Sequence, residues 1–397
     1  MIGKATRLDS QGPLGFDGGT GSSSEQRLIA AVRERGPLSR QDLAAATGLS
    51  MATINRAGAG LLKRRLLVTK GRKDSTGGRP AELLAYNGGA LTVAGISVTE
   101  TKASGVIMGL DGHEVSRSEV EFQPSTAGAE PTPEDRLDQT LRLFDEMVSA
   151  GHGALAVGVA VPGVVAGPDG TIGAIHEMGW DRLRLGSILA GRSPAKVVLE
   201  NDANCLAVGE KARGAGRQVE DLVAIVLRSG LGAGLMLQGR LYRGHRQEAG
   251  EIGYLLTSTD SLSRLFPGRG DFESRIGSES VGRQAAALGL VQAGREVSLP
   301  TVWALGARAG GRGQRLAQEL LDYIALGVAA LCVALDPEMV IMGGCDDLES
   351  MEAIIPALRE RLLGRILRVP RIVTAALGSD AIMIGAAQLA MEELVTI

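Results

Sequence analysis

Residues 197–204 read VVLENDAN, and this stretch decides the fold of the larger part of the chain. Three consecutive apolar residues before Glu200 are typical of a buried strand, and the polar residues that follow favour the start of a helix. A strand that leads straight into a helix is a building unit of α/β domains. We therefore expect an α/β fold around this stretch.

Further strands and helices are expected on both sides of residues 197–204. Asp111-Gly112 is a predicted hairpin turn, and a Pro-Gly pair ends the strand ALAVGVAVPG at residues 154–163. The other expected elements are strands at 91–98, 103–110, 114–122 and 339–344, a strand pair around a Gly-rich turn at 221–239, helices at 134–150 and 316–335, and a final helix. Strands that lead into Gly turns and helices imply a domain of two α/β lobes.

The N-terminal part shows the pattern of a helix-turn-helix. A first helix stops at Gly36-Pro37, and a second begins at Ser39, whose hydroxyl forms a capping box with Asp42. Gly48 allows the positive φ of a tight turn before the third helix. The apolar residues expected in the core of this unit are Leu28, Ile29, Val32, Leu43, Ile54, Leu61 and Leu62.

The third helix, at residues 51–65, is the expected recognition helix, because small polar and basic side chains near its start can reach base edges in a major groove. The basic hairpin KGRKDSTGGRP at residues 70–80 follows as a wing. Its Gly-Arg-Pro segment can place the Arg79 guanidinium in a narrow minor groove. A purely structural helical unit is the alternative. The residues expected to contact DNA are Ser39, Arg40, Ser50, Met51, Thr53, Asn55, Arg56, Arg72, Lys73 and Arg79.

Charge is distributed unevenly along the chain. Residues 21–80 hold twelve basic and four acidic side chains, a net charge of +8, which leaves −11 for the rest of a chain whose formal net charge is −3. A basic module on an acidic body indicates a polyanionic partner at one end only. An ordinary solvated surface would give the same count.

The composition predicts a cytoplasmic protein with no membrane contact. The start of the chain has no continuous apolar stretch of the kind found in signal peptides. The longest strongly apolar run, residues 324–335, is shorter than the ~20 residues needed to cross a bilayer, so a buried helix is expected there. The cysteines Cys205, Cys332 and Cys345 lie in apolar surroundings and suggest no disulfide framework.

Many blocks of the sequence resemble the ROK family of repressors and sugar kinases, from about Ser24 to the C-terminus. The blocks are LSRQDLAAATGLSMATINR (38–56), GGRP (77–80), GVAVPGVV (158–165), Gly179-Trp180, LENDANCLAVGE (199–210), SGLGAGL (229–235), GRLYRGHRQEAGEIG (239–253), PEMVIMGG (337–344) and SDAIMIGAA (379–387). The resemblance implies an α/β protein with an N-terminal winged helix-turn-helix followed by a two-lobed hexokinase/actin-like (ribonuclease H-like) domain, which binds its ligand between the lobes.

On this basis we expect a disordered arm at residues 1–22, the winged helix-turn-helix at 23–87 and the kinase-like domain at 88–397, which would also carry the oligomer contacts. One lobe would hold residues 88–198 plus 375–397, and the other residues 199–374.

The resemblance also implies which residues face the ligand. In the sugar kinases of the family, the carboxylate at the position of Asp202 accepts the proton of the attacking sugar hydroxyl. Asn201 and Glu251 stand where the family binds further hydroxyls, and Gly163 belongs to the matching GVAVPG block. Carboxylates and amides suit sugars because each can engage vicinal hydroxyls. The simpler interpretation of Asp202 is a helix N-cap after a strand.

The sequence departs from the family pattern where a kinase holds phosphate. The first phosphate loop of the family is Asp-x-Gly-x-Thr, and here Ser97 and Thr99 replace the Asp and the Gly. Glu100 adds a negative charge at the same place, and in the second loop Arg228 stands where a Gly is usual. We therefore expect no productive ATP·Mg²⁺ binding and no enzyme activity.

A second departure concerns metal. Many family members bind zinc through a His after Glu-Ile-Gly and three Cys, but here the His position is Tyr254 and residues 263–277 hold no Cys. Four-coordinate zinc cannot be assembled from these residues, so no metal and no cofactor is expected. Tyr254 remains a candidate ligand contact, as does Glu273, which stands near the place of a family Glu.

The sequence thus predicts a DNA-binding transcriptional regulator, most simply a repressor of sugar or carbon metabolism genes. A homodimer or tetramer would read a palindromic double-stranded operator, and a sugar or sugar derivative in the cleft would change the spacing of its winged units. Two alternatives stay open. One is an ATP-dependent sugar kinase with an accessory N-terminal module, and the other is a regulator that answers to a partner protein or to no ligand.

Overall fold

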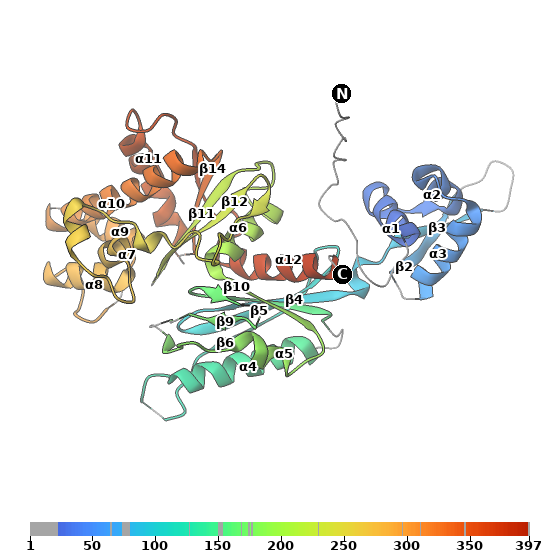
Figure 1. The fold of residues 1–397 in the computed structure, drawn as a ribbon, viewed down its shortest axis with the longest axis horizontal. Coiled ribbons are helices and arrows are strands. Elements are labelled where there is room, and N and C mark those ends of the chain that lie inside the picture. The colour runs from blue at the N-terminus through green and yellow to red at the C-terminus, as the bar shows by residue number, and fades with distance from the viewer. Residues whose placement is uncertain are drawn as a thin grey trace, which may run out of the picture.

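The computed structural model shows a small head joined to a larger body of two lobes (Figure 1). The structure describes residues 23–63, 66–73, 80–126, 128–149, 154–167, 169–173, 175, 178–228, 230–295, 297–309, 311–344 and 347–395. The expected N-terminal arm, residues 1–22, lies outside the described residues.

The head is a winged helix-turn-helix whose turn follows the sequence pattern. Its elements are α1 (Ser23–Arg35), β1 (Leu38–Ser39), α2 (Arg40–Thr47), α3 (Met51–Lys63), β2 (Leu67–Lys73) and β3 (Ala81–Tyr86), with the strands in the order β1-β3-β2. Ser39 caps α2, and the predicted capping box with Asp42 is confirmed. Gly48 ends α2 in the left-handed conformation at φ 67°, which leaves α3 free to cross α2.

The head has an apolar core of its own. Leu43, Ile54 and Leu61, which the sequence predicted to face inward, are each 0% exposed. Leu67 from β2 and Leu84 from β3 join the same cluster. The two wing strands therefore pack on the helices, and helix α3 is held on its inner face by tertiary contacts.

The first lobe is built on a five-stranded sheet of order β10-β7-β4-β5-β6. The lobe contains β4 (Thr92–Val98), β5 (Lys102–Gly109), β6 (Glu114–Glu121), α4 (Pro133–Ser149), β7 (Ala156–Val161), β8 (Val165–Ala166), β9 (Thr171–Ile172), α5 (Leu185–Ala190) and β10 (Lys196–Asn201). Every residue of β4 and β7 is buried, as expected for parallel strands covered on both faces. Strand β10 pairs with β7 as far as Asn201, so the sheet continues past residue 198, where we expected the lobes to divide.

The second lobe has a five-stranded sheet of order β13-β12-β11-β14-β15. It contains α6 (Asp202–Arg213), β11 (Leu222–Leu227), β12 (Leu231–Leu237), β13 (Arg240–Leu241), α7 (Asp271–Ile276), α8 (Ser278–Ala287), α9 (Leu299–Ala309), α10 (Gly311–Leu335), β14 (Met339–Gly343), α11 (Leu348–Leu362) and β15 (Arg371–Thr374). The central strands β11 and β14 are fully buried. Helices α7 to α9 and α11 were not expected from the sequence, although the apolar residues of α11 recur at helical spacing, with Met351, Ile354, Leu358 and Leu362 buried.

Helix α6 and the last helix, α12 (Ala381–Val395), pack together between the two sheets (Figure 1). Their backbones approach closely at two glycines. A Cβ at Gly385 would come within 1.8 Å of the Cys205 carbonyl oxygen, and one at Gly209 within 2.1 Å of the Ala381 carbonyl oxygen. Only glycine fits at such a crossing, so the two helices form one tightly packed layer between the lobes.

Helix α10 is longer than the apolar run that the sequence analysis singled out. Its 25 residues are enough in length and composition to cross a membrane, and 56% of its most apolar window is buried inside the protein. The buried face, which includes Leu320, Leu321 and Ile324, belongs to the largest apolar cluster of the second lobe. This burial favours a core helix of that lobe.

Candidate functional site

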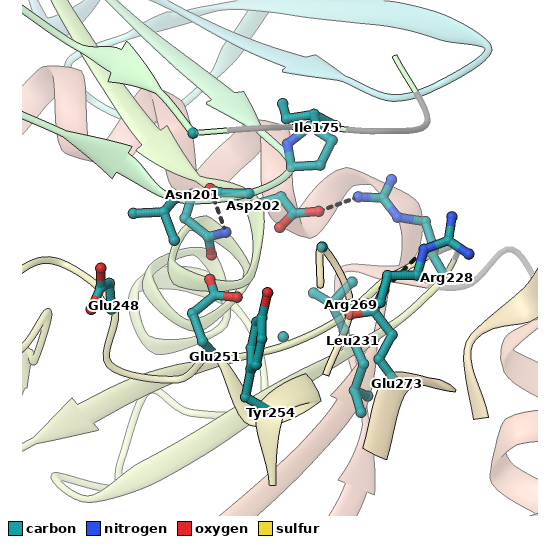
Figure 2. Close-up of a pocket in the computed structure, with 18 of the residues that line it drawn as sticks. Ile175, Asn201, Asp202, Arg228, Leu231, Glu248, Glu251, Tyr254, Arg269 and Glu273 are labelled. Atoms are coloured by element: carbon teal, nitrogen blue, oxygen red, sulfur yellow. Dashed lines mark hydrogen bonds and ion pairs between the residues drawn. The ribbon is translucent and has the colours of Figure 1, made fainter. Parts of the chain in front are cut away.

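A cleft of about 750 Å³ opens between the two lobes. All six residues expected to bind a ligand line it, and Figure 2 shows the side chains of the five other than Gly163 around the cleft. These six residues are Gly163, Asn201, Asp202, Glu251, Tyr254 and Glu273. Sequence reasoning missed two further charged lining residues, Glu248 and Arg269.

Asn201 both caps α6 and faces the cleft. Its Oδ1 accepts hydrogen bonds from the backbone N–H of Ala203 at 2.9 Å and of Asn204 at 3.1 Å, so the helix cap is Asn201 and not Asp202. Its Nδ2 donates to the carbonyl of Gly163 at 3.0 Å. An amide nitrogen carries two hydrogens, so this bond leaves a second donor for a ligand hydroxyl. The cleft wall and the helix start are therefore fixed by one side chain.

Asp202 is paired with the arginine that replaces the glycine of the second phosphate loop. The Arg228 Nη2 lies 2.5 Å from the Asp202 Oδ2, and the two side chains are only 19% and 10% exposed. Burial raises the pKa of Asp202 even though the Arg228 guanidinium opposes the rise, and Glu100 adds to it. The sequence analysis noted that Arg228 is unusual in a phosphate loop. It did not predict that Arg228 forms an ion pair with Asp202.

Glu251 and Tyr254 face the same space from the short turn that follows β13, where residues 252–254 form a 3-10 helix. Burial raises the pKa of Glu251 to about 7, and neighbouring carboxylates, Asp202 first, add to the rise. The side chain of Tyr254 is 52% exposed at the mouth of the cleft. A carboxyl whose pKa is raised, next to a phenol, provides both donors and acceptors of hydrogen bonds for a polyhydroxylated ligand.

A buried carboxylate, Glu200, ties together the two segments that carry these residues. Its Oε2 accepts from the Arg243 Nε at 2.7 Å, and its Oε1 accepts from the backbone N–H of Asn201 and from Asn204 Nδ2, each at 2.9 Å. Arg243 belongs to the loop that leads to Glu251. This bond fixes the distance between that loop and the start of α6, a role that the sequence did not reveal.

The loop that carries zinc cysteines in many family members is held here by Asp271. This residue is 1% exposed, and its Oδ2 accepts from the Thr257 backbone N–H and hydroxyl, both at 2.7 Å, and from the Ser261 hydroxyl at 2.6 Å. Burial acts against the charge, but the hydrogen bonds, with Arg275 nearby, lower the pKa of Asp271 to about 2. Within the described residues, no group of three His, Cys, Asp or Glu side chains is placed to hold a metal ion.

The segment that corresponds to the first phosphate loop is a closed turn between β4 and β5. The Thr99 hydroxyl donates to the carbonyl of Lys102 at 3.0 Å and accepts from its N–H at 3.2 Å. Glu100 lines the cleft, and its own carbonyl accepts from Arg136 Nε at 3.1 Å. The turn therefore presents the Glu100 carboxylate to the cleft.

On the head, the start of α3 carries the side chains expected to contact DNA. Ser50 caps this helix, with the Thr53 N–H donating to its hydroxyl at 3.2 Å. Met51 is 43% exposed, and Asn55 and Arg56 are exposed on the same helix. The uncovered face of α3 has the composition of a base-reading surface, small polar and basic groups beside one flexible apolar side chain.

The remaining predicted DNA contacts divide into three groups. Ser39 is 2% exposed and caps α2, so its side chain positions that helix and does not reach the surface. Arg40 is partly exposed and forms an ion pair with Glu82 at 3.2 Å, and Arg72 is exposed on β2. Lys73 ends β2 and its side chain is not described, and Arg79 lies outside the described residues.

Several curated proteins are similar to this chain. A xylose repressor of Bacillus spizizenii is 22% identical over 94% of this chain and 96% of its own length. A xylose repressor of Bacillus subtilis is 26% identical over 58% of this chain, a match that spans 60% of that protein. An N-acetyl-D-glucosamine kinase of Escherichia fergusonii is 30% identical over 66% of this chain and 90% of its own length.

Solved structures show the same architecture. A ROK family transcriptional regulator described as a homologue of the Escherichia coli Mlc protein superposes with a TM-score of 0.72 at 22% identity, over 94% of this chain and 96% of that one. A ROK family glucokinase from Streptomyces griseus, solved with glucose and AMPPNP, reaches 0.61 at 27% identity over 75% of this chain and 99% of its own. The sequence profile of the ROK family matches residues 93–393. The chain therefore belongs to the ROK family.

Proposed function

We propose that this protein is a DNA-binding transcriptional repressor whose interlobe cleft binds a sugar-type effector. The observation that carries the proposal is the Asp202–Arg228 pair, which occupies the carboxylate that a family kinase would need as its base. In the same chain, an exposed recognition helix stands on a basic head. Relatives named as repressors that align along nearly the whole chain support this combination.

In this proposal the protein acts in the cytoplasm as a homodimer or tetramer on a palindromic operator. An effector would favour one arrangement of the lobes and so change the spacing of the heads. A ~100-fold difference in effector affinity between two states supplies ~2.7 kcal/mol of coupling, enough to release an operator. The effector class is a sugar or sugar derivative, because the cleft offers carboxyl, amide and phenol groups on its walls.

The DNA part of the proposal is tested by selecting operator sequences with the full chain and then measuring variants by gel shift. Arg56→Ala is expected to weaken operator binding by about 1–3 kcal/mol and to relax the sequence preference. Arg35→Ala, which removes a charge from an exposed position on α1, is the matched control. Equal losses in both variants would mean that the head binds only through its charge, and no selection of any duplex would end the proposal.

The second candidate function is a sugar kinase, favoured by the retained carboxylate of Asp202 and by kinase relatives such as that of E. fergusonii. A coupled assay for ADP release with xylose, glucose and N-acetyl-D-glucosamine separates the two functions. We expect no turnover above background. Robust turnover that disappears in Asp202→Asn would replace the repressor proposal with the kinase.

A further inference from the structure

Helix α6 reaches from the cleft to the part of the body that adjoins the head. Its N-terminal end carries Asn201 and Asp202, which line the cleft. At its C-terminal end, Arg213 donates from Nη1 to the carbonyl of Gly112 at 2.5 Å. Residues 202–210 are all buried between the sheets, and the close crossing with α12 holds the helix along its length. A single stiff helix thus has one end in the ligand site and the other on the turn between β5 and β6.

That turn lies directly against the linker between head and body. The linker spans only residues 87–91, from the end of β3 to the start of β4. The Leu110 N–H donates to the Gly88 carbonyl at 3.0 Å and to the Leu91 carbonyl at 3.1 Å. A Cβ at Gly88 would come within 2.3 Å of the Asp111 Cβ and 2.8 Å of the Asp111 backbone nitrogen, so the linker backbone packs directly against Asp111 of the turn. Such close packing leaves little room for the linker to move without the turn.

The linker in turn continues from a strand that is anchored inside the head. Tyr86, the last residue of β3, lies under the Arg33 guanidinium of α1, 5.4 Å from the ring centroid. The Asn87 N–H donates to the Leu66 carbonyl at 3.0 Å. Arg33, Tyr86 and Asp111 line one crevice between the head and the body. Figure 1 shows the head beside the end of the first sheet where β4 begins.

We propose that α6 transmits the state of the cleft to the DNA-reading head, and that Arg213 is the positioning residue that joins its far end to the head linker. The inference deepens the proposed function by naming how effector binding would reach the head. A change at Asp202 shifts or tilts α6, Arg213 carries the movement to Gly112, and the turn displaces Gly88 and the strand that enters the head.

Gly112 is suited to this contact for two reasons. Its φ of +89° favours glycine, and a Cβ there would come within 2.3 Å of the Arg213 guanidinium. The Arg213 guanidinium therefore lies directly against the backbone of Gly112. Helix α12 offers a competing route, because Leu110 also packs against an apolar cluster that includes Met391 of that helix.

The test measures hydrogen exchange by mass spectrometry on the full chain without DNA or sugar, so it stays separate from the proposed function. Asp202→Asn disturbs the cleft end of α6 while Asn201 keeps the helix cap. We expect it to change exchange in peptides covering residues 86–91 and 109–113 by about threefold or more. In an Arg213→Met background the same substitution is expected to change these peptides by less than about 1.5-fold.

Two further variants keep the test decisive. Arg217→Met removes a cation from an exposed position just beyond the helix, and in that background the response to Asp202→Asn is expected to persist. Arg213→Lys, which keeps a donor, is expected to retain part of the response. An unchanged response in Arg213→Met would assign the link to α12 and overturn the proposal. No response in the wild-type background would overturn it as well, whereas failure to select an operator would count only against the proposed function.

Discussion

The two halves of the cleft present different chemical groups to a ligand. The half built from Gly163, Asn201 and Glu251 presents hydrogen-bonding groups of the kind that hold sugar hydroxyls. On the other side lie Glu100 and Arg228, which the sequence analysis expects at the phosphate positions, and the Arg228 guanidinium is paired with the Asp202 carboxylate. Under the proposed function, this contrast means that sugar recognition and phosphoryl transfer depend on separable parts of one cleft.

The largest expected effect is on stability, and it lies in the phosphate half. Arg228→Met leaves the Asp202 carboxylate buried without its cation, and removing one partner of a buried pair costs about 3–5 kcal/mol. We expect that loss in the free energy of unfolding by urea at pH 8. The loss should become smaller as the pH falls, because removing the guanidinium leaves the buried Asp202, whose pKa is already raised, easier to protonate.

The matched control for Arg228→Met is Arg192→Met. Arg192 pairs with Asp145 at the surface, where the two side chains are 39% and 42% exposed. An exposed pair is expected to contribute only about 0–1 kcal/mol. If both variants lost the same stability, the buried pair in the cleft would contribute no more than an exposed ion pair.

The next largest effect is on sugar affinity. It compares a Glu→Ala substitution in each half of the cleft. Glu251→Ala is expected to weaken binding of whichever of xylose, glucose and N-acetyl-D-glucosamine binds wild type by about 100-fold, since a charged hydrogen-bond partner is lost. Glu100→Ala should change it by less than about threefold, because that carboxylate faces the phosphate half. Isothermal titration calorimetry measures both. Similar losses would show that the cleft is one undivided site.

Much of the fold could be predicted from the sequence, because the motifs lie where backbone geometry requires particular residues. VVLENDAN did give a strand followed by a helix, but the strand lies at the edge of its sheet and its apolar residues 197–199 are only partly buried. The capping box of Ser39 and Asp42 formed as expected. The apolar periodicity of the central strands placed both sheets. Helices α7 to α9 escaped prediction because their short amphipathic faces pack on a core that exists only after the chain has folded.

Which residues line the cleft was easier to predict than the hydrogen bonds and ion pairs that these residues form. The sequence named Gly163, Asn201 and Glu251 as cleft residues, but not the bonds that Asn201 makes to Gly163 and to the start of α6. Arg228 and Asp202 are far apart in sequence, and their pairing follows from the tertiary approach of β11 to α6. The same is true of Arg243 and Glu200. Long-range charge pairs leave no periodic signal in a single sequence.

A smaller effect is expected in the pH dependence of stability. The pKa of Glu251 is raised to about 7 from its ordinary value of 4.5. The folded state thus binds this proton more tightly than the unfolded state, so the stabilisation is complete below about pH 4.5 and is lost as the pH rises through about 7. The shift corresponds to at most about 3.5 kcal/mol. Glu251→Gln should flatten the curve of unfolding free energy between pH 5 and pH 8.

Two other buried carboxyls, Asp271 and Asp202, help to interpret the pH dependence of stability in Glu251→Gln. Asp271, whose pKa is lowered to about 2, stays ionised throughout this range and contributes no slope. The buried Asp202, whose pKa is also raised, contributes a slope of the same sign that the variant keeps. A variant whose curve matched wild type would show that Glu251 is ionised in water-like surroundings, which would remove the distinction between an enclosed sugar half and an open cleft.

The smallest expected effect is the response to nucleotide. Without the Asp and Gly of the first phosphate loop, and with Glu100 facing the phosphates, we expect ATP·Mg²⁺ to bind more weakly than about 10 mM, so 5 mM nucleotide stabilises the protein by no more than about 0.2 kcal/mol. The melting temperature should then stay within about 1 °C of its value without nucleotide, while a bound sugar raises it further. Opening the site with Arg228→Gly should not restore nucleotide binding, because Ser97 still supplies no carboxylate to organise Mg²⁺. A shift of several degrees with ATP in the wild-type protein would mean that the phosphate half is functional, and the two halves would then have to be described as one kinase site.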